Sequence, residues 1–342
     1  MNLKQTILRK GIAPLLTGLG VHRLFRSGAV NDAILMFHGV TDKPGRTVRH
    51  MQTNEFVKLL QLLTAEFTIA PLDSVISGRD KMGKPRIALT FDDGYLNNFT
   101  EACPVLSQMN LPATFFLITD SLNNKNFTLP IDTIDCIIEK FLPASIKLDN
   151  TIFQNHNGIY LSGQENIFDY IIRNSERMHD FNQQLKQQFP FDFMNDPYYS
   201  VRVRYVDRET LESVSKDPLF SFGSHTQTHV NCINYEHDAL LKQLTESKLL
   251  IEQITGKDCN GIAYPYGLYD ERSRKLTRTA GYTSAYSVSY SLSQDRTDPD
   301  IFQRIGISNT TSPAVNLIHL SRLFKLRGVE LPVVEISSGK PQ

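Results

Sequence analysis

The amino-acid sequence predicts an α/β protein: a distorted β/α barrel of parallel strands and helices, with a mainly helical insertion. Short apolar runs rich in β-branched and aromatic residues, typical of buried parallel strands, alternate with segments of helical periodicity. Polar residues follow several of these runs directly, as they do at the carboxyl ends of barrel strands, where such folds carry their chemistry. The alternation lapses between Asp120 and Arg208, which we interpret as the insertion.

The length of the chain limits the number of domains, and its net charge limits the classes of partner. The 342 residues, 41% of them apolar, can bury a large core, and one domain with an insertion fits this length as well as two domains. The 36 Lys and Arg residues equal the 36 Asp and Glu residues, so we expect a neutral glycan rather than nucleic acid as partner. The four cysteines form no C-x-x-C motif, which favours free thiols in a reducing compartment: Cys103, Cys136, Cys232 and Cys259.

Residues 1–30 form a basic and apolar N-terminal segment. Its apolar run, Ile12 to Val21, is too short for a membrane span. No small-residue cleavage site follows this run, so we expect no cleaved signal peptide and a cytoplasmic location. Two interpretations of the segment remain open: a peripheral contact with the inner face of an anionic membrane, or a helix packed on the protein's own flank.

In the first part of the chain, a strand, a helix and a strand follow one another, which is typical of right-handed crossover units. The first helix begins with an asparagine cap and places its apolar residues on one face. We predict strands at Ala33–Val40, Phe67–Ala70, Ile87–Phe91 and Ala113–Ile118, and helices at Asn54–Phe67 and Asn98–Met109.

The insertion covers about residues 121–207, and the alternation of strands and helices resumes after it. Because binding loops are carried by rigid scaffolds, the insertion either determines substrate choice or serves only as a structural cap. Within it we predict helices at Ile131–Leu142 and inside Phe168–Phe189. Beyond it we predict strands at Leu219–Phe222, Gly261–Tyr264, Thr283–Tyr286 and Arg304–Ile307, a helix from the cap Asn234 to Ile254 that Gly256 ends, and a helix at Asp270–Ala280.

Two adjacent acids, Asp92 and Asp93, follow the strand Ile87–Phe91 in the motif T-F-D-D-G. Adjacent residues that leave a strand point to opposite sides, so the two carboxylates can take different roles at one site. They would repel each other unless a cation or a proton lay between them. The motif therefore predicts a metal ion, although Asp-Asp-Gly is also an ordinary turn sequence.

A pair of histidines, His225 and His229, follows a second apolar run in the motif S-H-T-Q-T-H. Imidazoles four residues apart share one face of a helical turn, and a divalent metal can bridge them. This spacing alone is a weak signal, but together with T-F-D-D-G it predicts a metal site strongly.

These two motifs together resemble those of the polysaccharide deacetylases, a carbohydrate esterase family with a NodB-like domain, over about residues 34–307. The resemblance implies a NodB-type barrel, with a catalytic domain at 31–325 and a C-terminal tail at 326–342. It implies that Asp93, His225 and His229 hold a divalent metal, most often Zn²⁺, and that Asp92 is the general base.

Three further residues follow from the same resemblance. The strand L-M-F-H-G-V is similar to a strand of circularly permuted members, which implies His38 as the general acid, with His319 as the alternative. The turn Y-P-Y-G implies that the backbone N–H of Tyr266 binds the oxyanion. Many members pair the base with an arginine where this chain has Ala263, so we expect Arg304 to orient Asp92 instead. The chain also lacks the family's usual tryptophan.

The expected activity is metal-dependent removal of N-acetyl groups from an N-acetylated sugar, in a surface polysaccharide or its lipid-linked precursor. A metal with three protein ligands lowers the pKa of its water from about 16 towards about 7 and polarises the acetamide carbonyl. The alternatives are an O-acetyl esterase, a hydrolase of small cyclic amides, and a catalytically silent glycan-binding module.

Overall fold

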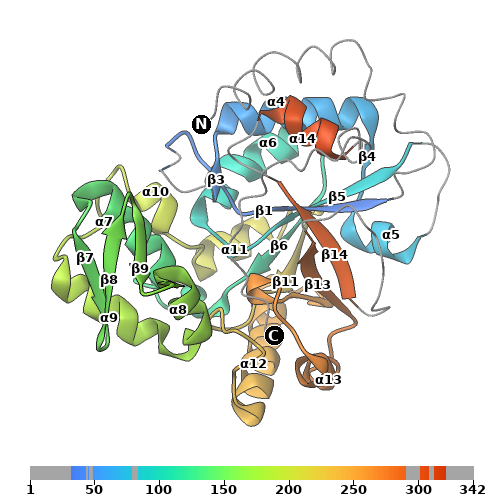
Figure 1. Cartoon of the computed structure of the whole chain (residues 1–342). Helices are drawn as coiled ribbons and strands as arrows, with labels where there is room; N and C mark the ends of the chain where they lie inside the picture. The colour runs from blue at the N-terminus through green and yellow to red at the C-terminus, as the bar shows by residue number, and fades with distance from the viewer. Residues whose placement is uncertain are drawn as a thin grey trace.

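The computed structural model describes residues 32–43, 45, 49–78, 84–289, 301–307 and 312–320, without the side chains of 289 and 317–320. The segment 1–30 and the tail 326–342, for which we made predictions, lie outside the described residues. A barrel and a second lobe beside it make up the described chain (Figure 1). No helix among the described residues has both the length and the apolar character needed to span a bilayer.

Seven parallel strands of the described chain close into a ring in the order β1-β14-β13-β12-β11-β6-β5, and β5 pairs with β1. The short strand β4 also pairs with β5, outside the ring. The strands are β1 (Ala33–Phe37), β4 (Thr68–Ile69), β5 (Arg86–Phe91), β6 (Ala113–Leu117), β11 (Phe220–Ser224), β12 (Gly261–Ala263), β13 (Ser284–Ser289) and β14 (Ile301–Gly306). The predicted α/β barrel is confirmed.

Helices surround this ring (Figure 1). They are α4 (Thr53–Glu66), α5 (Leu72–Ser77), α6 (Cys103–Gln108), α11 (Arg208–Val214), α12 (His237–Thr255), α13 (Glu271–Thr279) and α14 (Pro313–Leu320). A π-helical turn, Asn98–Ala102, precedes α6 within the helix predicted at 98–109. A small separate sheet pairs β2 (Gly39–Val40) with β3 (His50–Met51).

The cap of helix α12 lies two residues later in the sequence than we predicted. We predicted Asn234 as the cap of α12, but the carboxylate of Glu236 accepts hydrogen bonds from the first backbone N–H groups of this helix, those of Asp238 and Ala239. The side chain of Asn234 instead donates to the backbone of Arg173 in the insertion. The predicted end at Gly256 is confirmed, with a left-handed φ of 64°.

The strands bury both faces, as expected for a closed parallel sheet. On one face, four aromatic rings from β1, β5, β6 and β11 stack side by side beneath the helices, with centroids 5.1–6.1 Å apart: Phe37, Phe91, Phe115 and Phe222. Alternate residues of the same strands form a second, smaller cluster inside the ring, which includes Ile34, Ala88 and Phe116. Packing on both faces holds the strand ends in fixed positions.

The insertion forms a lobe with its own hydrophobic core. It contains the predicted helices, as α7 (Pro130–Phe141), α8 (Ile167–Arg173) and α9 (Met178–Gln188), together with the short α10 (Ser200–Val203). It also contains an antiparallel sheet that we did not predict: β7 (Ser145–Leu148), β8 (Thr151–His156), β9 (Ile159–Ser162) and β10 (Glu165–Asn166). The lobe is therefore a helical layer packed on a sheet (Figure 1).

Candidate active site

The acidic motif and the histidine motif meet because their strands are parallel and lie close together in the barrel. Strand β6 pairs with both β5 and β11, so Asp92 and His225 leave the same end of the barrel. Backbone hydrogen bonds continue beyond the strands: His225 N–H donates to Leu117 at 2.8 Å, and Ile118 N–H donates to Asp93 at 3.4 Å. The barrel thus fixes the backbone that carries both motifs.

The side chains of Asp93, His225 and His229 converge, with one ligand atom from each lying within 4.8 Å of the others. Oδ1 of Asp93 lies 3.4 Å from Nε2 of His225 and 3.3 Å from Nε2 of His229. All three residues are buried. The two histidines do not share a helical turn as we expected: they lie in an irregular loop, and Thr226 and His229 have left-handed φ values of 64° and 60°.

Hydrogen bonds to the far side of each imidazole orient its free nitrogen towards Asp93. Nδ1 of His225 donates to the carbonyl oxygen of Ala263 at 2.7 Å, so in the neutral imidazole Nε2 is the nitrogen that can bind a metal. Nδ1 of His229 lies 3.1 Å from the hydroxyl of Tyr266. Two ligands about 2.0–2.1 Å from a tetrahedral zinc ion lie about 3.4 Å apart, so the observed spacing suits such an ion.

The backbone at Asp93 and Gly94 is left-handed at both residues, as in the tight turns that Asp-Gly sequences favour. Asp93 itself has a left-handed φ of 71°, and Gly94, which allows such values without strain, has a φ of 77°. Left-handed backbone at a non-glycine residue costs free energy and concentrates at functional sites. Burial raises the pKa of Asp93, but hydrogen bonds with the two imidazoles outweigh burial and hold this pKa well below its usual range.

Asp92 forms an ion pair with Arg304 on β14. The two guanidinium nitrogens Nη1 and Nη2 donate to the two carboxylate oxygens at 2.6 Å each, and both side chains are buried. Arg304 also donates to the hydroxyl of Thr90 at 3.3 Å. Burial raises the pKa of Asp92, but the charge and hydrogen bonds of Arg304, together with the charges of His225 and His38, outweigh burial and leave the pKa below its ordinary value. Asp92 is therefore an oriented carboxylate next in sequence to Asp93, one of the three converging residues.

His38 follows β1 and faces the same end of the barrel. Phe37 pairs with Phe91, so His38 and Asp92 leave neighbouring strands at the same level, and His38 is half-buried. Its charge helps to lower the pKa of Asp92. The alternative residue, His319, lies in α14, which packs on α4, and its side chain is outside the described residues.

Tyr266 lies in the predicted P-Y-G turn, with a left-handed φ of 61°. Its ring packs edge-on against His229 at a centroid distance of 4.5 Å. Burial raises the pKa of Tyr266 above its usual range, so its hydroxyl stays protonated. The turn therefore lies beside the group of Asp93, His225 and His229, because the side chain of Tyr266 contacts His229.

A buried polar network that we did not predict from the sequence joins the insertion to this site. The hydroxyls of Tyr95 and Tyr205 both donate to the carboxylate of Asp132 on α7, the first at 3.0 Å. Nη2 of Arg49 lies 2.9 Å from the same carboxylate. Tyr95 is two residues from Asp93, so the network supports the acidic turn. An acidic residue in the apolar run L-P-I-D-T-I is the signal that could have predicted a buried partner.

The fold and the site together define a parallel α/β barrel with a candidate metal centre at the carboxyl ends of its strands. A family model described as polysaccharide deacetylase matches residues 79–285, more than half of the chain. The chain belongs to the polysaccharide deacetylase family, whose members are hydrolases of carbon–nitrogen bonds in N-acetylated glycans.

A relative with a curated name agrees with this family. A Staphylococcus aureus (strain MSSA476) protein named poly-β-1,6-N-acetyl-D-glucosamine N-deacetylase is 25% identical over 138 residues, which cover 40% of this chain and 46% of that protein. The match thus spans about half the length of the curated relative.

Two solved structures share the fold. The Streptococcus pyogenes deacetylase PplD in complex with acetate has a TM-score of 0.57 and 15% identity, and the match covers 85% of this chain and 99% of that chain. IcaB from Ammonifex degensii has a TM-score of 0.54 and 14% identity, and covers 85% and 98%. Identities this low are evidence for the fold alone.

Proposed function

We propose that this protein is a metal-dependent hydrolase that removes N-acetyl groups from an N-acetylated sugar in a surface polysaccharide or its lipid-linked precursor. The observation that carries the proposal is the group Asp93, His225 and His229 beside the ion pair of Asp92 and Arg304. Membership of the polysaccharide deacetylase family and the curated name of the Staphylococcus aureus relative support the choice of substrate.

Asp93, His225 and His229 would hold the divalent cation, and their two nitrogen donors and one oxygen donor suit Zn²⁺. When bound, such a cation polarises the acetamide carbonyl and lowers the pKa of water. Asp92, held as an anion by Arg304, would accept a proton from the attacking water.

His38 would be the proton donor. It follows β1, the strand that pairs with β5, and Asp92 follows β5. His38 would donate a proton to the sugar nitrogen as the bond between this nitrogen and the acetyl carbon breaks. The products are acetate and a free amine. The backbone N–H of Tyr266 would donate a hydrogen bond to the carbonyl oxygen as negative charge develops on it.

The test measures acetate released from β-1,6-linked N-acetylglucosamine oligomers by the full chain, with chelator and after Zn²⁺ is restored. Asp92→Asn should lower turnover by about 10²–10⁴-fold and still bind Zn²⁺, since Asp92 is not among the ligands. Asp93→Asn should lose both Zn²⁺ and turnover. The control Asp238→Asn changes an exposed carboxylate on α12 and should keep both.

Other outcomes would replace the proposal. Acetate released only from O-acetylated sugars would make the protein an esterase. Stoichiometric Zn²⁺ with no acetate from either class of sugar would contradict both a deacetylase and an esterase.

A further inference from the structure

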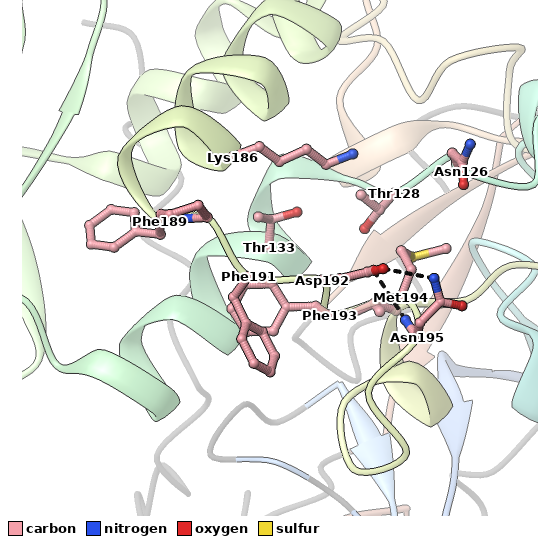
Figure 2. A pocket seen from close by; sticks show the side chains of 12 residues that line it. Asn126, Thr128, Thr133, Lys186, Phe189, Phe191, Asp192, Phe193, Met194 and Asn195 are labelled. Atoms are coloured by element: carbon pink, nitrogen blue, oxygen red, sulfur yellow. Dashed lines mark hydrogen bonds between the residues drawn. The ribbon is translucent and has the colours of Figure 1, made fainter.

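The insertion contains a pocket of about 470 Å³, and none of its lining residues belongs to the candidate active site. Helix α7, the end of α9 and the segment 189–195 surround it (Figure 2). This volume lies within the roughly 300–1,000 Å³ typical of small-ligand sites. The pocket is therefore large enough for a small ligand, and the proposed mechanism does not use it.

One buried hydroxyl in this pocket lacks a partner. Thr128 is only 7% exposed, and its Oγ1 makes no hydrogen bond to any described residue. Figure 2 shows this hydroxyl directed into the pocket. By contrast, the hydroxyl of Thr133, which also lines the pocket, donates to the side chain of Asn182 at 3.0 Å. An unpaired buried hydroxyl costs about 1–3 kcal/mol, and a polar ligand atom would remove that cost once the side chains that cover this hydroxyl move apart.

The remaining lining combines an apolar wall with polar groups of balanced charge. Phe191, Phe193 and Met194 form part of the wall. Lys186 and Asp192 supply one charge of each sign, and the carboxylate of Asp192 already accepts two hydrogen bonds from Asn195, at 3.2 and 2.7 Å. Because the two charges are opposite, the lining favours a ligand without net charge. The polar groups suit hydroxyl groups on this ligand, and the wall suits an apolar face.

The pocket is joined to the candidate active site by a short series of packed rings. Phe127, which precedes Thr128, packs its ring against Tyr205 at a centroid distance of 5.0 Å, and Tyr205 packs against Tyr95 at 4.9 Å. Tyr95 follows Asp93 by two residues. Three packed rings thus separate the pocket from the acidic turn, and a glycan that occupied both sites would have to cross the surface between them.

We propose that this pocket binds an uncharged N-acetylated pyranose unit of a glycan whose other units extend towards the active site. The inference rests on the proposed function for the identity of the sugar. The pocket would act as a second binding site that favours long substrates, because a single sugar cannot occupy both places at once.

The test measures binding of a pentamer of β-1,6-linked N-acetylglucosamine, and of N-acetylglucosamine alone, to the full chain in the presence of chelator. Thr128→Val removes only the unpaired hydroxyl and should weaken pentamer binding about 3–10-fold, the value of one hydrogen bond. Asn126→Ala, which truncates an exposed lining side chain, should also weaken it. Binding of the single sugar should be weak in the unaltered chain and in both variants, because one unit cannot occupy the pocket and the active site together.

The matched control is Thr53→Val, because Thr53 also has a buried hydroxyl without a partner among the described residues, but lies on α4 away from the pocket. This variant should bind the pentamer like the unaltered chain. The pocket proposal is overturned if both pocket variants bind the pentamer as tightly as the control, or if the unaltered chain does not bind it. Weaker pentamer binding by the pocket variants of a protein that releases no acetate would support the pocket and overturn the proposed reaction.

Discussion

Arg304 is the only cation in hydrogen-bond contact with Asp92 among the described residues, and it is fully buried. Arg304→Met would leave a buried carboxylate without its partner, which typically costs about 3–5 kcal/mol of unfolding free energy. Adding Asp92→Asn should recover part of this loss, since the unpaired charge is then gone. Urea unfolding of the metal-free protein measures both effects.

The control for this experiment is Arg173→Met, because Arg173 is 59% exposed and pairs with Glu165 at the surface. Surface ion pairs contribute about 0–1 kcal/mol, so this variant should unfold nearly like the unaltered chain. A double variant Arg304→Met with Asp92→Asn that is less stable than Arg304→Met alone would show that the charge of Asp92 is not what Arg304 compensates.

The identity of the general acid is a second prediction at the level of one residue. His38→Ala should lower the deacetylation rate by about 10²–10⁴-fold and leave Zn²⁺ binding intact, because His38 leaves the strand beside Asp92 but is not in the ligand group. His319→Ala should leave turnover unchanged. Loss of turnover in His319→Ala alone would reverse the assignment.

At the level of elements, β3 carries a histidine that is buried in its neutral form. Burial, together with the charge of Arg49, lowers the pKa of His50 to about 3. Nδ1 of His50 lies 3.1 Å from the side-chain amide of Asn97, which also accepts a hydrogen bond from the backbone of Val40 on β2. Gly39 has no room for a side chain here, since a Cβ would lie 1.9 Å from the ring of His50.

This histidine predicts a dependence of stability on pH. Between pH 6.5 and about 3 the unfolded chain binds a proton at His50 and the folded chain does not, so its contribution to stability falls as the pH is lowered. The contribution falls by up to about 1.4 kcal/mol per pH unit. His50→Asn should flatten this slope in urea unfolding measured from pH 7 to pH 4, whereas His156→Asn, an exposed change on β8, should not. Equal slopes in the two variants would contradict a neutral buried His50.

Local sequence patterns predicted most elements of the barrel, because apolar strands and helices with one apolar face are local signals. They failed where a contact with residues far away in the sequence determines the local structure. The sheet of the insertion has half-polar strands, and only the hairpin turn Asn157-Gly158, with left-handed φ values of 57° and 88°, identifies it in the sequence. The loop of His225 and His229 is held by neighbours such as Ala263, so spacing alone wrongly predicted a helical turn.

At the level of the whole molecule, closure of the barrel is what completes the candidate site. The strand β14 returns to pair with β1, and this brings Arg304 to Asp92 across 212 residues of sequence. Motifs in the sequence could identify the two acids and the two histidines, since each group is contiguous with its own strand. The contacts of Arg49 and Asp132 could not be predicted in this way, because they depend on how the insertion packs on the barrel.

The ligand group joins β5 to β11, so a metal ion bound there should stabilise the whole fold. An ion that binds only the folded chain, at about 100 times its dissociation constant, adds about 2.7 kcal/mol. For a chain of this size we expect the melting temperature to rise by about 4 °C when Zn²⁺ is added to chelator-treated protein. Asp93→Asn should abolish the rise and Asp238→Asn should keep it, as measured by calorimetry. The same rise in Asp93→Asn would mean that the stabilising ion binds outside the group of Asp93, His225 and His229.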